Sequence, residues 1–295
     1  MNVGITIARN VIKADYPIKE AIFSVLPLVD DFIVAVGNSD DDTRNYIAQL
    51  NEIKDPSWPE IRIIDTVWDD NLREGGRVLA VETNKALAAV PREATWVIYI
   101  QADECLHQED YPAIQAAMNT YAQDEQVHGL LLKYKHFYGS YDYVGDSRRW
   151  YRNEIRIIKN RRDISSWKDA QGFRFFNEQK LQVKPINAYV YHYGWVKHPK
   201  AQQQKQEQFH RLWHDDQFMQ KNVLGKDSFD YGVVDSLQHY QGSHPAIMSE
   251  RINRINWKFE VDPTRKNFGF KAAFLYWFEK TFGVRIGEYK NYKII

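Results

Sequence analysis

The sequence predicts an α/β protein with a Rossmann-like, mostly parallel sheet flanked by helices, followed by a helical C-terminal extension. Two observations lead to this fold class. The first hundred residues alternate strand-like and helix-like segments in the order β-α-β-α-β-α-β, which predicts parallel strands covered by helices. After residue 125 the alternation stops, and longer strand-like segments follow one another with little helix between them.

Four strand-like segments carry the alternation, each rich in apolar and β-branched residues. They are residues 3–8, 31–37, 60–65 and 95–100. Each is short and bounded by polar residues, so we expect four adjacent strands of one sheet.

Three helix-like segments lie between these strands, at residues 17–26, 39–53 and 75–90. The first begins at Pro17, which suits a first helical turn. The second opens with three carboxylates, which stabilise the positive end of a helix dipole. The third follows a glycine pair. Each helix therefore has its own start signal.

The later part of the chain predicts strands at residues 128–139, 153–160 and 187–196, and becomes helical and polar beyond Pro199. We therefore divide the chain into an α/β core, residues 1–196, and a helical extension, residues 197–295.

The composition excludes some classes of function. The 39 basic and 39 acidic side chains give a net charge of zero, which argues against a nucleic-acid-binding protein. The N-terminus lacks the pattern of a signal peptide, and no run of eighteen apolar residues predicts a transmembrane helix. Cys105 is the single cysteine. We therefore expect a cytoplasmic protein.

Polar residues follow all four predicted strands: "ARN", "GNSDDD", "DTVWDD" and "QADE". In open parallel sheets, ligands bind beyond the carboxyl ends of the strands. Three of these four ends are acidic, so the pattern predicts a shared cation. The alternative is four solvated loops in which some of the acids cap helices.

Residues 1–195 resemble family 2 glycosyltransferases of the GT-A fold, of the bacterial surface-polysaccharide type. The resemblance rests on the opening block "ITIARNVIKADYPIKEAIFSVLPLVDDFIVAVGNSDDDT" and on "GGRVLAVETNKALAAVPREATWVIYIQADECL". It implies a GT-A-like core that moves a hexose from a nucleotide-diphosphate donor to a hydroxyl of a glycan or lipid-linked saccharide. It also implies inversion at the sugar carbon and assistance by Mg²⁺ or Mn²⁺.

The resemblance also implies roles for the acidic strand end. Asp103 is the expected direct metal ligand, with Glu104 beside it and His192 reaching the metal or the diphosphate from late in the core. Gln101 stands where the family usually has an acid. An amide can still bind ribose hydroxyls but adds no charge. His192 is alternatively a buried core residue among tyrosines.

Further residues are expected to contact the nucleotide-sugar. The first strand ends at the family's nucleotide loop, the second at its base-reading turn, and the third helix begins with a basic residue suited to phosphate. Gln101 and Asp103 belong to this set, together with Ala8, Arg9, Asn10, Asn38, Asp41 and Arg77. The alternative for Arg77 is a salt bridge to a neighbouring acid.

An inverting reaction needs a base for the acceptor hydroxyl, and the family supplies an acid between the metal motif and the late histidine. Asp169 in "WKDAQGF" is the expected base, with Glu178 and Asp146 in reserve. The alternative for Asp169 is a surface carboxylate paired with Lys168 or Arg174.

The last part of the extension, residues 251–295, carries ten basic and four acidic side chains and the aromatic segment "FGFKAAFLYWFEKTFG". The favoured interpretation is a helix that packs on the core or on a second subunit as a homodimer. The alternative is an amphipathic helix on the inner membrane face, near a lipid-linked acceptor.

Two rival functions stay open. A nucleotidyltransferase uses a similar sheet, but the opening block lacks its Gly-rich phosphate loop. A catalytically altered carbohydrate- or nucleotide-binding protein of the same fold is kept open by Gln101.

Overall fold

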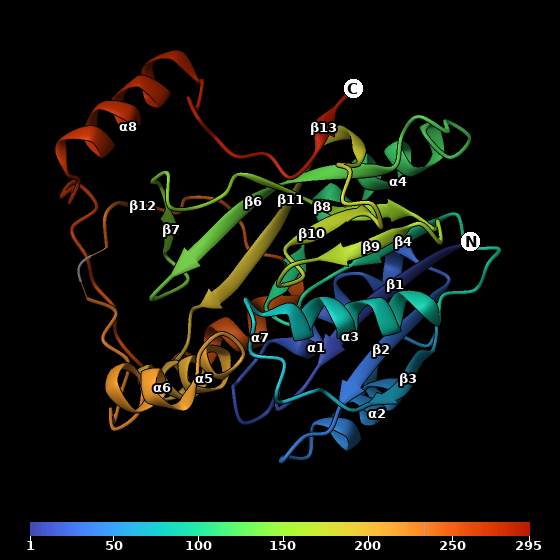
Figure 1. The fold of residues 1–295 in the computed structure, drawn as a ribbon, viewed down its shortest axis with the longest axis horizontal. Helices are drawn as coiled ribbons and strands as arrows, with labels where there is room; N and C mark the ends of the chain where they lie inside the picture. The colour runs from blue at the N-terminus through green and yellow to red at the C-terminus, as the bar shows by residue number, and fades with distance from the viewer. Residues whose placement is uncertain (233) are drawn as a thin grey trace.

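The computed structural model describes residues 1–232 and 234–295. A large, strongly curled sheet runs through the molecule in the order β12-β7-β6-β8-β4-β1-β2-β3, and β11 lies beside β6 (Figure 1). The α/β fold class predicted from the sequence is confirmed.

The first half of the sheet is parallel, as predicted. It consists of β1 (Asn2–Ala8), β2 (Asp31–Gly37), β3 (Ile61–Thr66) and β4 (Trp96–Tyr99), ordered β3-β2-β1-β4. This order matches the first four strands of the doubly wound order 3-2-1-4-5-6. The carboxyl ends of these strands therefore meet along one edge.

The second half is mixed. β8 (Asn153–Lys159) pairs antiparallel with both β4 and β6 (Gly129–Tyr138), and β11 (Gln182–Trp195) is parallel to β6. The smaller strands extend this part of the sheet or form a separate hairpin of β9 and β10. They are β5 (Glu104–Leu106), β7 (Tyr143–Gly145), β9 (Ile164–Trp167), β10 (Gly172–Phe175), β12 (Leu237–His239) and β13 (Lys293–Ile294).

Helices and the hairpin cover the two faces of the sheet. One core cluster joins the sheet to α1 (Ile18–Phe23), α2 (Thr43–Ile53) and α4 (Tyr111–Thr120). The opposite cluster joins it to α3 (Arg77–Ala88) and to the β9–β10 hairpin. Alternate residues of β2 enter the two clusters, because successive side chains of a strand point to opposite faces.

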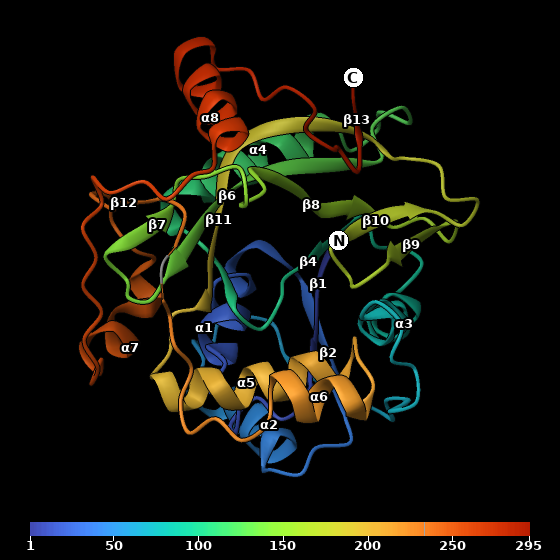
Figure 2. The ribbon, with the colours of Figure 1, turned by 60° about the vertical axis from the view of Figure 1, so that its left-hand side comes forward.

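The segment after residue 196 contains α5 (Pro199–Arg211), α6 (Asp216–Asn222), α7 (Ser249–Asn253) and α8 (Phe270–Phe282). It also returns to the sheet, since β12 pairs with β7 and β13 pairs with β11. α5 and α6 lie side by side across the lower part of the molecule in Figure 2.

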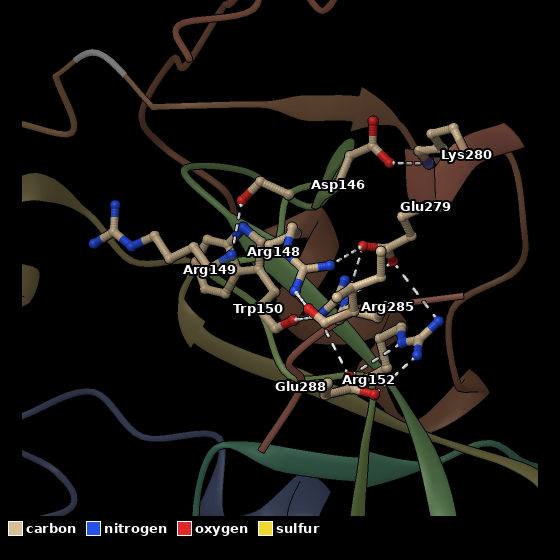
Figure 3. A network of polar contacts seen from close by, with 11 residues as sticks. Asp146, Arg148, Arg149, Trp150, Arg152, Glu279, Lys280, Arg285 and Glu288 are labelled. Carbon is tan, nitrogen blue, oxygen red and sulfur yellow. Dashed lines mark hydrogen bonds and ion pairs between the residues drawn. The ribbon is translucent and has the colours of Figure 1, made fainter. Parts of the chain in front are cut away.

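α8 stands apart from the sheet (Figures 1 and 2). Its polar side makes the attachments: Glu279 pairs with Arg148 and Arg285, and Lys280 pairs with Asp146 (Figure 3). None of its residues is buried. The helix is thus attached through its polar side and does not pack into the core, and the expected contact with a second subunit stays a prediction.

The aromatic side of α8 faces outward, with Phe270 94% and Trp277 54% exposed. Along the described residues, no helix combines the length and apolar character needed to cross a membrane.

Candidate active site

A cavity of about 1190 Å³ opens at the carboxyl ends of the parallel strands. The residues that line it come from the ends of β1 and β4, the loop after β9, the end of β11 and residues 204–211 of α5. Among them are seven of the residues predicted from the sequence: Ala8, Arg9, Asn10, Gln101, Asp103, Asp169 and His192. The topology thus gathers residues separated by up to 184 positions, as the strand-end argument requires.

Asp103 and His192 face each other in this cavity, with 3.8 Å between Oδ2 of the carboxylate and Nε2 of the imidazole. Gly194 permits this approach, because a Cβ there would lie 2.7 Å from both atoms. Gly194 therefore makes room for the contact between two side chains of the site.

Lys205, in the middle of α5, reaches the same carboxylate. Its Nζ donates to Asp103 Oδ2 at 2.9 Å and to the Gly194 carbonyl at 2.7 Å. Burial alone would raise the pKa of Asp103, but the Lys205 ammonium holds it well below its usual range. Asp103 is therefore ionised and already has a positive partner within the chain.

Glu104 points away from the cavity into the core, where it is fully buried. Its two oxygens accept hydrogen bonds at 2.9 Å each from Nε and Nη2 of Arg156, and Tyr134 donates a third at 2.8 Å. Since Asp103 and Glu104 are adjacent and β5 begins at Glu104, their side chains diverge. Glu104 is thus engaged in a buried ion pair on the other side of the strand.

Gln101 lies at the cavity wall, where its Nε2 donates to the carbonyl of Ala170 at 3.2 Å. Its backbone N–H donates to Glu104. The amide therefore links the end of β4 to the loop that carries Asp169.

Asp169 lines the cavity on a turn in which both neighbours, Lys168 and Ala170, have positive φ angles of 54° and 58°. Such backbone strain is frequent at functional sites. Burial raises the pKa of Asp169, and no described residue forms an ion pair with it within 4 Å. Neither Lys168 nor Arg174 is its partner, so the carboxylate is free to accept a proton.

The loop after β1 is held by the turn after β2. Asn10 has φ 53°, its side-chain oxygen accepts from the Asp40 backbone N–H at 2.7 Å, and its backbone N–H donates to the Ser39 hydroxyl at 3.0 Å. Arg9 donates to the Asn38 carbonyl and pairs with Asp70. These contacts fix the loop at the edge of the cavity.

Other predicted residues lie outside the cavity lining. Asp41 caps α2 through Thr43 and accepts from the Lys13 backbone, so Asp40 lines the cavity in its place. The Asn38 side chain accepts from the backbone of Trp68. Arg77 is exposed and lies 4.0 Å from Glu74, in the salt bridge given as its alternative.

The two reserve bases also lie elsewhere. Asp146 is tied to Lys266, Tyr276 and Lys280 near α8, and Glu178 is exposed in a turn after β10. Neither belongs to the cavity lining.

The sequence reasoning missed five basic residues that line the cavity: Lys13, Arg73, Arg149, Lys205 and Arg211. Among the described residues, Arg149 and Arg211 form no ion pair within 4 Å. The basic and polar content of residues 199–211 was visible, but its position over the strand ends was not, because nothing local in the sequence indicates where that helix docks.

The residues that line the cavity do not by themselves form a metal centre. Among residues 1–232 and 234–295, no group of three His, Cys, Asp or Glu side chains could hold a metal ion. Asp103 and His192 are two suitable ligands, but Lys205 bonds to the carboxylate oxygen that faces the histidine. The predicted Mg²⁺ or Mn²⁺ therefore fits this arrangement poorly, since a divalent ion would first have to displace the ammonium.

Comparison with known proteins gives no family. No family model matches the chain, and no curated protein matches it. Among solved structures, it is similar to TarS of S. aureus, with 12% identity and a TM-score of 0.40 over 77% of this chain and 40% of that one. A second TarS structure, residues 1–349 in complex with UDP, gives 16% identity and a TM-score of 0.32, covering 46% and 36%.

Glucosyl-3-phosphoglycerate synthase from Mycobacterium tuberculosis, in complex with Mn²⁺, UDP-glucose and phosphoglyceric acid, is 21% identical with a TM-score of 0.29, covering 47% and 43%. 4-Diphosphocytidyl-2C-methyl-D-erythritol synthase from Anaerococcus prevotii is 12% identical with a TM-score of 0.38, covering 64% and 89%. The chain spans less than half the length of the first three of these structures. With TM-scores this low, they assign no function to it.

Proposed function

We propose that the chain is an inverting glycosyltransferase that uses a nucleotide-diphosphate sugar. The observation that carries this proposal is the single cavity in which a free carboxylate, Asp169, and several cationic groups line the carboxyl ends of a parallel sheet. Positive groups suit a diphosphate, and a carboxylate whose pKa is raised by burial suits general base catalysis.

In the proposed reaction, Asp169 takes the proton of an acceptor hydroxyl as that oxygen bonds to the anomeric carbon of the sugar. The bond from this carbon to the diphosphate oxygen breaks, and its electron pair leaves with the diphosphate. Arg149 and Arg211 stabilise the charge that gathers there. Arg9 and Asn10 contact the nucleotide part of the donor.

The finer assignments belong to the same proposal. The donated sugar is a hexose, and the acceptor is a hydroxyl of a glycan or a lipid-linked saccharide. Residues 1–196 form the donor-binding core, and residues 197–295 serve acceptor, membrane-surface or dimer contacts. α5 adds a wall to the donor cavity.

The test is a panel of UDP- and GDP-sugars offered to the purified chain, with release of UDP or GDP as the readout. We expect binding and slow hydrolysis for at least one donor. Asp169→Asn should bind that donor normally and turn it over about 10²–10⁴-fold more slowly. Glu178→Gln is the matched control, since that carboxylate lies outside the cavity.

Two further outcomes separate the rival functions. Binding of a nucleotide-sugar without turnover, in the wild-type chain as well as in Asp169→Asn, would identify a binding protein of the same fold. Pyrophosphate release from a nucleoside triphosphate would identify a nucleotidyltransferase. Either result would overturn the proposal.

A further inference from the structure

Lys205 occupies the position where the sequence predicts a metal ion. Its ammonium lies between Asp103 and the Gly194 carbonyl, and the residue is only 8% exposed. It also lies 5.1 Å from the centre of the Tyr16 ring, whose face attracts a cation. Three different groups of the core thus stabilise one positive charge from α5.

The imidazole of His192, which faces Asp103, is arranged as a hydrogen-bond acceptor. His136 Nε2 lies 2.9 Å from the carbonyl of Tyr151 and must donate to it, because a carbonyl only accepts. Neutral His136 then accepts at Nδ1 from Nδ1 of His192, 3.2 Å away. This leaves a lone pair on Nε2 of His192, the atom that faces Asp103. The floor of the cavity therefore presents two acceptors to a cation.

The ammonium is charged and has bonding capacity to spare. Its Nζ lies 2.9 Å from Oδ2 of the Asp103 carboxylate, and such an ion pair favours the charged form. An ammonium has three N–H donors, and Asp103 and Gly194 accept two of them. The third is available to an oxygen of a molecule in the cavity that Lys205 lines.

We propose, on the basis of the function proposed above, that Lys205 takes the place of the divalent cation and donates to the diphosphate of the donor as it leaves. Lys205 keeps its proton throughout. The bond from sugar to phosphate breaks with its electron pair on the diphosphate, and the acceptor's proton goes to Asp169. Donor binding and turnover are then independent of a metal.

The test is calorimetric titration of the whole chain with UDP and GDP, in excess EDTA and in Mn²⁺. We expect equal affinity in the two conditions. Lys205→Met should weaken the binding of the diphosphate about 10- to 100-fold, the range for a lost hydrogen bond to a charged group. Lys205→Arg, which keeps the charge, should recover part of the loss. Lys200→Met, an exposed lysine of the same helix, is the control.

The Lys205→Met variant leaves the Asp103 carboxylate buried without its partner. The melting temperature of this variant is therefore compared with that of the double variant Asp103→Asn/Lys205→Met, in which no charge is left unpaired. The double variant should fold and still bind the diphosphate weakly in both conditions.

Binding that requires Mn²⁺, and that tightens when Lys205 is replaced by Met, would overturn this role. Lys205 would then compete with a metal, and the glycosyltransferase proposal would stand. Absence of UDP and GDP binding in both conditions would refute both proposals.

Discussion

The Glu104→Ala variant should unfold more easily than the wild type. It should not behave like a variant that has lost a metal ligand. Glu104 is fully buried and accepts two hydrogen bonds from Arg156, one from Tyr134 and one from the backbone of Gln101. Without the carboxylate, the guanidinium of Arg156 stays buried with a net charge and only carbonyl acceptors.

The size of the effect follows from this geometry. Removing one partner of a buried ion pair destabilises a protein by about 3–5 kcal/mol. At about 2 °C per kcal/mol for a chain of this size, the melting temperature should fall by about 6–10 °C. Glu104→Leu/Arg156→Met, which removes both charges, should lose less than either single variant, because no unpaired charge remains.

Thermal unfolding followed by circular dichroism measures both effects, and titration with UDP or GDP gives the affinity of the folded fraction. A melting temperature within 2 °C of the wild type, combined with lost nucleotide binding, would contradict the buried-pair argument. It would return Glu104 to the role of metal ligand that the sequence predicted.

Four further outcomes are expected. In a profile of kcat/KM against pH, the apparent pKa on the acid side should lie above the usual Asp pKa of about 4, because burial raises the pKa of Asp169 and only the deprotonated base is active. An apparent pKa at or below about 4 would point to another base. Gln101→Asp should tighten Mn²⁺ binding or leave it unchanged in calorimetry, and should keep the melting temperature, since this strand end borders the cavity; a large drop in melting temperature would show that the cavity does not solvate it. His192→Ala should weaken binding of the diphosphate as well as turnover; unfolding with unchanged affinity in the folded fraction would make the histidine a core residue. Trp277→Glu on the exposed side of α8 should reduce co-sedimentation with anionic vesicles and leave donor affinity unchanged; a lower molar mass by light scattering would instead assign that side to a dimer.

The sequence was sufficient for the parallel half of the fold, because each of its strands and helices carries a local signal. It was also sufficient to gather the strand ends, since parallel strands must end at one edge. The sequence could not tell which of the two adjacent carboxylates, Asp103 or Glu104, faces the cavity. Adjacent residues look alike in a motif, but the turn before β5 sends one into the cavity and the other to Arg156.

The contribution of α5 could not be predicted for a different reason. Lys205 meets Asp103 across 102 positions of the chain, and the contact depends on how the helix docks after β11. Its far end is fixed where the backbone N–H of Gly76 donates to the carbonyl of Leu212. No periodicity or spacing encodes such a contact, so only the assembled structure reveals it.

The docking of α5 also has a consequence for biosynthesis. During translation β1 and β4, whose ends line the cavity, are made well before the helix that completes it. A nascent chain that stops short of residue 199 has the sheet edge and Asp103, but lacks the ammonium that pairs with this carboxylate. Under the proposed function, the full affinity for the diphosphate is reached only after α5 has left the ribosome and folded back onto the sheet edge.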